Sequence, residues 1–461
     1  MERTDFDFLA ARCKGPVLLP GQEGYDEERT GFNLAARHRP EVIVGAARPD
    51  DVAAAVAFAV ARGLPVAVQN TGHGFSVPAE GGLLVTTRRM TTVRVDPAAR
   101  SAYVEAGVRF EQLVPEAARH GLAPLNGSAP HVGVVSYTLG GGLPLLGRTH
   151  GWAADRVLAM DVVTADGERR HVTPEAEPDL YWALLGGRDN FGIVTGMEFG
   201  LVPVVRLYGG GLFYDAEQVP GLLEAYAGWT TTVPDEMNSS VALIPFPDDP
   251  QIPEPMRGRR VWHVRIAFTG SAEDGTRLVE PLRRLGPRLL ENLRDMPYEH
   301  NADIHDDPPV PMPWAADNIF LADPDGGTVR TLLKHTSDEA APPAIVEVRH
   351  LGGALSRRPA HPNAVGRRDA PFMLAVLVPL ANDSAADAHA FAFLRHLFEE
   401  LNPWTAGRFL NFMGHGTAAD QERTRTAYTP DDHKRLTALK AAYDPGNTFR
   451  LNYNIAPGTG A

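Results

Sequence analysis

The chain has 461 residues, 44% of them hydrophobic and 22% charged, a composition that is typical of globular proteins and argues against disorder. At this length one hydrophobic core no longer suffices, so two domains are expected. The 44 Lys and Arg against 57 Asp and Glu give a net charge of −13, which disfavours nucleic acid and anionic membranes as partners.

Nothing in the sequence indicates a membrane or an oxidising compartment. The first twenty residues lack the continuous apolar stretch of a secretory signal, and apolar runs such as residues 372–380 are too short to span a bilayer. Cys13 is the single cysteine, so no intrachain disulfide or thiolate metal cluster can form. We expect a cytoplasmic protein, and the sequence indicates no particular oligomeric state.

The first regular elements are expected in a βαβ-like order. The apolar run 42–44 predicts a strand, the Ala- and Val-rich segment 52–61 predicts a helix, and residues 65–69 predict a buried strand. Asp50 or Asp51 is expected to accept hydrogen bonds from the free amides of the first helical turn.

Two hairpins with a helix between them are predicted next. Residues 92–106 break at AspProAla and residues 157–172 break at AspGly, while residues 110–119 have the pattern of a helix. Beyond about residue 204, longer strands alternate with amphipathic helices, for example at 260–268, 345–350 and 372–378. We therefore place a domain boundary near Pro203.

A glycine-rich segment follows the second buried strand. In ValGlnAsnThrGlyHisGlyPhe, residues 68–75, Gly72 and Gly74 flank His73, so the backbone can direct N–H groups at an anion while the imidazole is held outward. Alone, this pattern is more typical of a glycine-rich turn with an incidental histidine.

A second segment, residues 126–142, is also rich in glycine and nearly free of charge. Two such loops can hold the pyrophosphate and the ring system of one dinucleotide. Residues 142–149 have Walker A spacing, but Arg148 replaces the lysine and Pro144 lies inside the loop, so a P-loop is rejected. The Rossmann glycine fingerprint is missing after the first strand, so another dinucleotide-binding fold is expected.

Further motifs occur in order along the chain. They are GlyHisGly at 72–74, ValGly at 132–133, GlyGlyGly at 140–142, GlyTrpAlaAlaAsp at 151–155, AspLeuTyrTrpAlaLeuLeuGlyGlyArgAspAsnPheGlyIleValThr at 179–195, PheLeuAsnPheMetGly at 409–414 and TyrAspProGlyAsnThrPheArgLeuAsnTyrAsnIle at 443–455. In these motifs the chain resembles, nearly end to end, the berberine bridge enzyme group of FAD-linked oxidases within the vanillyl-alcohol-oxidase-type superfamily.

The resemblance implies an α+β fold. A PCMH-type FAD-binding domain of two subdomains would comprise residues 1–203 and a C-terminal return at 428–461. The inserted substrate domain, residues 204–427, would be an antiparallel sheet covered by helices. The resemblance also implies FAD joined through its 8α-methyl group to His73. The other residues implied at the cofactor are Asn70, Thr71, Gly72, Gly74, Gly133, Ser136, Gly140, Gly141, Gly192, Val194, Asn452 and Asn454.

Three positions depart from the family pattern. Many members attach FAD a second time through a cysteine, where this chain has Ala129, so a single covalent link through His73 is expected. Gln69 replaces a usual arginine and Thr71 a usual glycine. Pyrophosphate binding must therefore depend on backbone N–H groups and on Asn70.

Strand alternation supplies candidates for the catalytic base. His263 and Arg265 share one face of their strand, and Glu347 lies beside Arg349 on another. If helices cover the apolar faces, these polar faces point toward the flavin. Glu347 is the first choice, with its pKa raised in a water-poor site. The alternative is that Glu347 forms a structural ion pair with either arginine.

For each of the other candidate site residues, a purely structural role is the alternative. Tyr137 and Tyr453 are rival bases or simply packed aromatic rings. His131 is expected near flavin N5 or in a loop hydrogen bond, and Asn411 either orients substrate or caps a strand end. His300, Asp303 and His305 lie in a Pro-bounded loop without a register that would bring them together, so no metal site is expected.

The leading function hypothesis is an oxidase that transfers hydride from a small organic, secondary-metabolite-like substrate to FAD, with O2 as the electron acceptor. A histidyl bond raises the flavin potential, which favours such chemistry. An alternative is oxidative cyclisation, rearrangement or oxygenation in a biosynthetic pathway. A third hypothesis is a catalytically silent flavin-binding or carbohydrate-binding protein.

Overall fold

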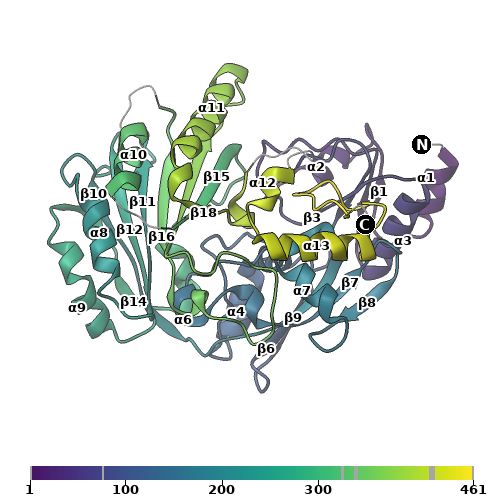
Figure 1. The fold of residues 1–461 in the computed structure, drawn as a ribbon, viewed down its shortest axis with the longest axis horizontal. Helices are drawn as coiled ribbons and strands as arrows, with labels where there is room; N and C mark the ends of the chain where they lie inside the picture. Colours follow the sequence, from purple (N-terminus) through teal and green to yellow (C-terminus); the bar gives the residue numbers. More distant parts are fainter. Residues whose placement is uncertain (1–2, 75–76, 323–325, 337–340, 415–420, 459–461) are drawn as a thin grey trace.

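The computed structural model describes residues 3–74, 77–322, 326–336, 341–414 and 421–458, so Phe75 at the end of the first glycine-rich segment lies outside it. Within these residues the strands form sheets of four, five and nine strands. Figure 1 shows the two smaller sheets in one lobe, here called the terminal lobe, and the nine-stranded sheet in the other, the central lobe. This is the expected α+β arrangement.

The four-stranded sheet has the order β1-β2-β4-β3, with β1 antiparallel to β2 and the other pairs parallel. Its segment of the chain comprises α1 Arg3–Ala10, β1 Val17–Leu18, α2 Tyr25–Arg29, β2 Val42–Gly45, α3 Pro49–Ala61, β3 Val66–Gln69 and β4 Leu83–Thr86. The strand, helix and strand predicted from the apolar pattern are confirmed. β3 ends at Gln69, directly before the first glycine-rich loop.

The capping role expected of Asp50 or Asp51 is wrong. Helix α3 begins at Pro49, and no side chain caps its first turn. The buried Asp51 carboxylate instead accepts hydrogen bonds from the backbone amides of Lys14, Gly15 and Ala47 at 2.9–3.0 Å. Because those amides precede the helix, Asp51 ties the N-terminal segment to the start of α3.

The five-stranded sheet is antiparallel in the order β5-β6-β9-β7-β8. Both predicted hairpins and the helix between them are confirmed here. The segment comprises β5 Val93–Asp96, β6 Ser101–Glu105, α4 Phe110–Ala118, α5 Val134–Leu139, α6 Gly147–His150, β7 Val157–Val163, β8 Arg169–Val172, α7 Pro178–Gly187 and β9 Ile193–Gly200. Helix α5 forms part of the second glycine-rich segment.

The nine-stranded sheet is antiparallel, in the order β13-β10-β12-β11-β16-β17-β15-β18 with β14 beside β10. Its strands are β10 Arg206–Asp215, β11 Met237–Pro245, β12 Arg260–Phe268, β13 Arg288–Glu291, β14 Arg294–Pro297, β15 Trp314–Leu321, β16 Ile345–His350, β17 Phe372–Pro379 and β18 Thr405–Gly407. The helices that follow them are α8 Leu222–Thr230, α9 Ala272–Arg283, α10 Gly326–Thr336 and α11 Ser384–Glu400.

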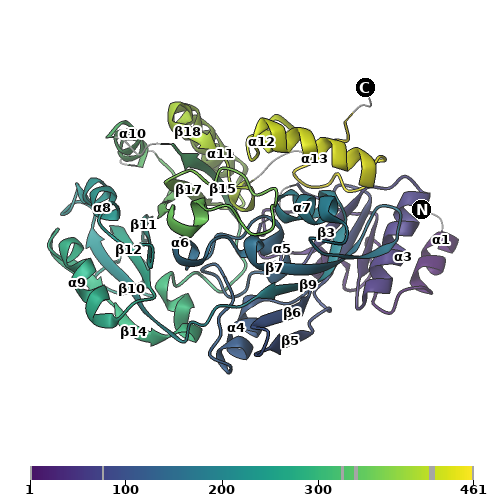
Figure 2. The ribbon, with the colours of Figure 1, turned by 60° about the horizontal axis from the view of Figure 1, so that its bottom comes forward.

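The two faces of this sheet differ, as the alternation predicts. Apolar side chains such as Val241, Val264 and Val348 form one core with residues of α8, α9, α10 and α11. Figures 1 and 2 show α8, α9 and α10 along the outer side of the sheet, away from the terminal lobe. The opposite face, which carries Arg265 and Glu347, is therefore directed toward the terminal lobe.

The chain returns to the terminal lobe through α12 Gln421–Arg425 and α13 Pro430–Tyr443, which packs on α7. Short 3-10 turns connect other elements: η1 Ala153–Arg156, η2 Arg188–Asn190, η3 Tyr298–Ile304, η4 Gly353–Ser356, η5 Asn402–Trp404 and η6 Leu410–Phe412. No helix in the described ranges is both long and apolar enough to cross a membrane. β9 ends at Gly200 and β10 begins at Arg206, so Pro203 lies between the two sheets.

Candidate active site

His73 lies in the loop that leaves β3, and its ring is fixed on two sides. The imidazole stacks on Phe32 with ring centroids 3.9 Å apart and an interplanar angle of 12°. Its Nδ1 lies 2.9 Å from the Thr71 hydroxyl oxygen. Its Nε2 is buried and has no hydrogen-bond partner among the described residues. Thr71 and Phe32 thus orient a ring whose other polar atom remains open to a further group.

Burial keeps the His73 imidazole neutral. Desolvation lowers the pKa of His73 to about 3, and the positive charges of His131 and Arg109 act in the same direction, against an opposing effect of Asp307. A neutral imidazole keeps a lone pair on one ring nitrogen. Its lone pair is what an imidazole needs to form a covalent bond with an electrophilic carbon.

The two glycine-rich loops predicted to act together lie against each other. Gly72 has a φ of 69°, in the left-handed region that favours glycine. The Phe32 amide donates to the Thr71 carbonyl at 2.8 Å, which holds the first loop from outside. In the second loop, a Cβ added to Gly133 would stand 2.5 Å from Asn70 Nδ2. Glycine at position 133 therefore allows the loops to meet.

Asn411, in η6 of the returning chain, contacts both loops. A Cβ on Gly140 would overlap Asn411 Oδ1, and one on Gly74 would stand 3.4 Å from the Asn411 carbonyl oxygen. Asn411 Nδ2 donates to the Tyr137 carbonyl at 2.8 Å. From the sequence, Asn411 was expected either to orient substrate or to cap a strand end. In the structure its side chain holds the backbone of the second glycine-rich loop.

The C-terminal segment 452–455 is fastened to the terminal lobe by Asn190. The Asn190 amide donates to the Tyr453 carbonyl at 3.0 Å and accepts from the Ile455 N–H at 2.8 Å. The Oδ1 atoms of Asn452 and Asn454 are buried, and the described part of the chain offers them no hydrogen-bond partner. Both expected C-terminal contact residues therefore present an unsatisfied acceptor.

The remaining expected contact residues lie in the second glycine-rich segment and at the start of β9. Ser136 Oγ donates to the Gly133 carbonyl at 3.3 Å. Gly141 has a φ of 106°. Gly192 has a φ of 151°, and a Cβ there would stand 2.6 Å from a carbonyl oxygen of β7. Val194 is a buried residue of β9.

This arrangement fits a large polar cofactor, because several buried polar atoms have no partner within the described ranges. They are Gln69 Oε1, Asn70 Oδ1 and Nδ2, His73 Nε2, Tyr137 OH, Asn452 Oδ1 and Asn454 Oδ1. Each buried unsatisfied group costs about 1–3 kcal/mol, so a cluster of them indicates a binding site for polar atoms. The donors, acceptors and bare glycine backbone suit the pyrophosphate and the ring system of FAD.

Glu347 lies on the polar face of the nine-stranded sheet and is an ion-paired carboxylate. Oε1 accepts from Ser240 Oγ at 2.7 Å and from Arg265 Nη1 at 2.8 Å, and Oε2 accepts from Arg349 Nε at 2.9 Å. Burial opposes ionisation, but the charges of Arg349 and Arg265 hold the pKa of Glu347 well below its usual range. The raised pKa expected from the sequence is wrong, and the alternative ion pair is present.

His263 lies beside this ion pair and is neutral. Its ring stacks on Phe213 with centroids 4.0 Å apart, and Nδ1 accepts from Arg265 Nε at 3.2 Å. Burial and the positive charges of Arg265 and His305 hold the pKa of His263 well below its usual range. His263 therefore remains uncharged at neutral pH.

The two candidate tyrosines differ in their hydroxyl groups. The Tyr137 hydroxyl is buried without a hydrogen-bond partner in the described chain. Burial holds the pKa of Tyr137 well above 10, against the opposing charge of Arg349, so this hydroxyl stays protonated. The Tyr453 hydroxyl donates to the Met413 carbonyl. Tyr137 is thus suited to donate a hydrogen bond to a bound molecule.

His131 lies close to His73 but has a partner of its own. Its Nδ1 is 2.8 Å from Glu111 Oε2, and its ring centroid is 6.5 Å from that of Phe32, on which His73 stacks. One of the two expectations for His131 was a hydrogen bond to the loop backbone. Its partner in the structure is instead the Glu111 carboxylate.

The loop residues that superficially resemble a metal site do not converge. His300 Nδ1 is 4.0 Å from Asp303 on the surface. His305 is buried, with Nε2 3.4 Å from Glu347 Oε1. His305 therefore extends the ion-paired cluster, a role that the sequence did not indicate.

A cavity of about 40 Å³ lies between the polar face of the sheet and the chain that follows the second glycine-rich loop. Its walls include Leu143, Ser240, Arg265, His305, Arg349 and Leu351. Sequence reasoning missed Phe32 and the place of His305 beside Glu347, and it named Thr71 at the cofactor without the role of its hydroxyl in orienting His73. Phe32 has no local motif, whereas Thr71 was visible as a departure from the family pattern.

Comparisons with known proteins find two matching family models and several relatives that align over most of the chain. Residues 40–173 match the family described as FAD binding domain, and residues 408–456 match the family described as berberine and berberine like. (R)-6-Hydroxynicotine oxidase of Paenarthrobacter nicotinovorans is 28% identical over 96% of this chain and 97% of its own length. Glucooligosaccharide oxidase of Sarocladium strictum is 31% identical over 94% of this chain and 91% of its own length.

Solved structures show the same architecture. The structure of 6-hydroxy-D-nicotine oxidase from Arthrobacter nicotinovorans matches with a TM-score of 0.84 and 26% identity, over 97% of this chain and 98% of that one. A carbohydrate oxidase from Microdochium nivale matches with a TM-score of 0.85 over 99% of this chain and 100% of that one. The latter is 20% identical and shows the fold alone.

Proposed function

Because the chain belongs to the FAD-linked oxidoreductases of the berberine bridge enzyme type, we propose that His73 carries its FAD through a single covalent bond. The protein is an FAD-dependent oxidoreductase. The observation that carries the proposal is the neutral His73 ring, oriented by Thr71 and Phe32, with a buried nitrogen that lacks a partner among the described residues. Ala129 offers no thiol for a second bond.

A solved relative illustrates the contrast. The glucooligosaccharide oxidase of Acremonium strictum has a 6-S-cysteinyl, 8α-N1-histidyl FAD, which is a double attachment in that protein. Here the histidine is present and the cysteine position expected from the family pattern is Ala129. A single histidyl bond is the attachment that these two residues support.

Bound between these loops, FAD would supply the acceptor for a hydride from the substrate carbon, with O2 as the final electron acceptor. The substrate is a small organic molecule with an oxidisable alcohol or amine carbon. The names of two relatives specify 6-hydroxynicotine and glucooligosaccharides, which are substrates of those proteins. The polar side chains of the central lobe face the loops that hold FAD, and Tyr137 would orient the substrate by donating a hydrogen bond.

The other site residues have separate proposed roles. Asn70 and the backbone of both glycine-rich loops would hold the pyrophosphate, and Asn452 and Asn454 would hold the ring system. Glu347 keeps Arg265 and Arg349 in place and is ionised, so we assign it a positioning role. His263 and His131 shape the surroundings of the reacting carbon. His263 does so without a charge, because its pKa is held well below its usual range.

The attachment is tested by acid precipitation of the purified protein. The wild-type pellet should stay yellow, and its intact mass should exceed that of the polypeptide by one FAD. His73→Ala should release FAD into the supernatant. His131→Ala is the matched control, because it removes a nearby imidazole and should keep the bond. A colourless wild-type pellet with a bare polypeptide mass would refute the covalent link.

Reactivity with O2 separates an oxidase from a silent flavin-binding protein. After photoreduction without oxygen, the bound flavin of an oxidase should regain its oxidised absorption within seconds of exposure to air, and the protein should oxidise at least one compound in a screen of alcohols and amines. Product mass then distinguishes loss of two hydrogens from gain of an oxygen. A flavin that reoxidises only slowly, with no turnover in the screen, would contradict oxidase activity.

A further inference from the structure

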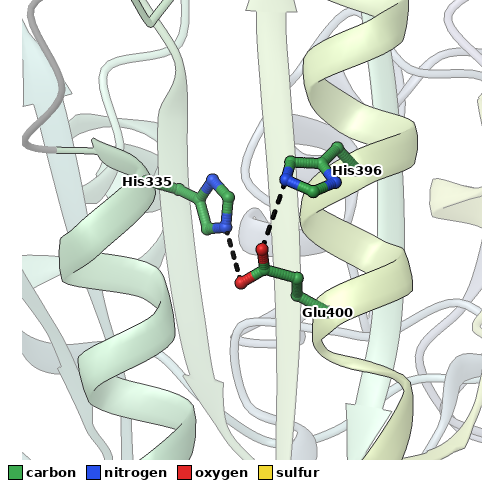
Figure 3. A group of neighbouring side chains, drawn as sticks. All are labelled: His335, His396 and Glu400. Carbon is green, nitrogen blue, oxygen red and sulfur yellow. Dashed lines mark ion pairs between the residues drawn. The ribbon is translucent and has the colours of Figure 1, made fainter.

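Two helices on the outer side of the central lobe bring three potential metal ligands together. His335 comes from α10, and His396 and Glu400 come from α11 (Figure 3). His335 Nε2 lies 3.0 Å from Glu400 Oε2, and His396 Nε2 lies 3.2 Å from Glu400 Oε1. One ligand atom from each residue falls within 4.8 Å of the others. Both imidazoles therefore point at one carboxylate.

The two nitrogen-to-oxygen distances are close to those between neighbouring ligand atoms of one metal ion. Zn²⁺ takes imidazole nitrogen and carboxylate oxygen ligands at about 2.0–2.2 Å, which places tetrahedral ligand atoms about 3.3 Å apart. The ring centroids of His335 and His396 are 5.3 Å apart, with an interplanar angle of 83°. His396 and Glu400 are four residues apart on one helix, which puts both on the same face.

The site combines a fixed ligand with accessible ones. The His335 side chain is 10% exposed, whereas His396 is 64% and Glu400 32% exposed. The fixed imidazole reduces the entropy lost on binding, and the exposed side gives a hydrated cation access and leaves room for a water ligand. Such an arrangement of three protein ligands and one open position is common for zinc.

We propose that His335, His396 and Glu400 bind a divalent transition-metal cation of the Zn²⁺ class, which joins α10 to α11. Two imidazoles and one carboxylate favour such a cation over Ca²⁺ or Mg²⁺, which prefer oxygen ligands. The helices cover the apolar face of the nine-stranded sheet, opposite to the face with Arg265 and Glu347. The metal would thus fasten the outer layer of the central lobe and take no part in flavin chemistry.

Lys334 is the competitor for this site. Its Nζ lies 3.2 and 3.3 Å from the two oxygens of Glu400, and its side chain is 68% exposed. A bound cation displaces the ammonium group because two like charges cannot share the carboxylate at that distance. Removing Lys334 should therefore strengthen metal binding, which a cluster of simple ion pairs does not predict.

The test is a calorimetric titration of ZnCl2 into the flavin-containing protein after removal of metals with a chelator. Wild type should bind one Zn²⁺ per chain in the site. His396→Ala and Glu400→Gln should weaken that binding at least tenfold, and Lys334→Met should tighten it severalfold. His300→Ala, which removes an exposed histidine elsewhere, should change nothing. His396 is exposed, so its replacement leaves the core intact.

Spectroscopy identifies the ligands independently of affinity. The Cu²⁺-loaded protein should give an electron paramagnetic resonance signal with two coordinated nitrogens, and His396→Ala should reduce this number to one. Wild-type protein without a stoichiometric Zn²⁺ site would overturn the proposal. Equal zinc affinity in wild type, His396→Ala and Glu400→Gln would overturn it too.

Discussion

Tyr137 and Tyr453 differ in what their hydroxyl groups contact. The Tyr137 hydroxyl is buried without a partner in the described residues, whereas the Tyr453 hydroxyl donates to a backbone carbonyl. We predict that Tyr137→Phe lowers kcat/KM about 10- to 100-fold, because it removes a buried hydrogen bond to substrate. The pH dependence of kcat/KM should keep its shape, because the Tyr137 hydroxyl stays protonated. Tyr453→Phe should lower the free energy of unfolding by about 1 kcal/mol and change turnover little. Steady-state kinetics together with denaturant unfolding separate the two.

The ion pairs of Glu347 lead to a stability prediction at the same scale. Glu347→Gln leaves Arg265 and Arg349 buried without their counter-charge, so the free energy of unfolding should fall by about 3–5 kcal/mol. Glu280→Gln, at an exposed pair with Arg284, is the control and should cost less than about 1 kcal/mol. A large loss of kcat at unchanged stability would instead make Glu347 a catalytic base.

At the scale of elements, the C-terminal return depends on one buried ion pair. Lys440 and Asp444 are both fully buried, with Lys440 Nζ 2.7 Å from Asp444 Oδ2. Lys440 also donates to the carbonyls of Asn190 and Phe449, and Asp444 also accepts from the amides of Thr448 and Phe449. This network sets the path of the chain toward residues 452–455.

We therefore predict that Asp444→Asn costs about 3–5 kcal/mol of stability, because it leaves a buried ammonium group without its counter-charge. The same variant should contain less flavin, since the segment with Asn452 and Asn454 is displaced. Arg435→Ala, on the exposed side of α13 where it pairs with Asp179, is the matched control and should keep both. Unfolding curves and the ratio of flavin to protein absorbance measure the two effects. Full flavin content in a destabilised Asp444→Asn protein would show that flavin binding does not depend on this ion pair.

At the scale of the whole molecule, Arg148 joins the two lobes. This residue of α6 donates through its backbone N–H to Asn238 Oδ1 at 2.7 Å and through Nε to the Met237 carbonyl at 2.9 Å. Its Nη1 donates to the Leu351 carbonyl and lies 2.9 Å from His350 Nε2. Arg148, which takes the place of the lysine in the rejected P-loop pattern, is thus a buried contact between the lobes.

This contact makes stability depend on pH. Burial, and then the charge of Arg148, lowers the pKa of His350 to about 3. As the pH falls below about 6.5, the unfolded chain binds a proton at this histidine and the folded protein does not. Each pH unit from there down to the folded pKa should therefore lower the free energy of unfolding by about 1.4 kcal/mol for this residue.

Denaturant unfolding at pH 7.5, 6.5 and 5.5 checks this prediction. Desolvation lowers the pKa values of His38, His150 and His263 as well, so the dependence of wild-type stability on pH should exceed that of one group. His350→Gln should reduce the change in the free energy of unfolding per pH unit by the amount that one proton contributes. Identical slopes for wild type and His350→Gln would show that His350 is protonated in the folded protein.

Short-range sequence patterns were enough to predict the local elements and the two glycine-rich loops. Apolar alternation and turn residues sufficed for β2, α3, β3 and both hairpins, because backbone periodicity is a property of neighbouring residues. The glycines around His73 were equally legible, since a left-handed or closely approached backbone restricts the residue type itself. The ordered motifs then carried the family and its fold.

Which polar groups meet, and which protonation states result, depends on how distant segments fold together. Glu347 and Arg265 are 82 positions apart, and Asn411 and Tyr137 are 274 apart, so no local pattern records either contact. In the proposed metal site, His396 and Glu400 are near neighbours on α11, but His335 comes from α10. Coulomb energies and hydrogen bonds act over a few ångströms in space, and the folding of distant segments sets those distances.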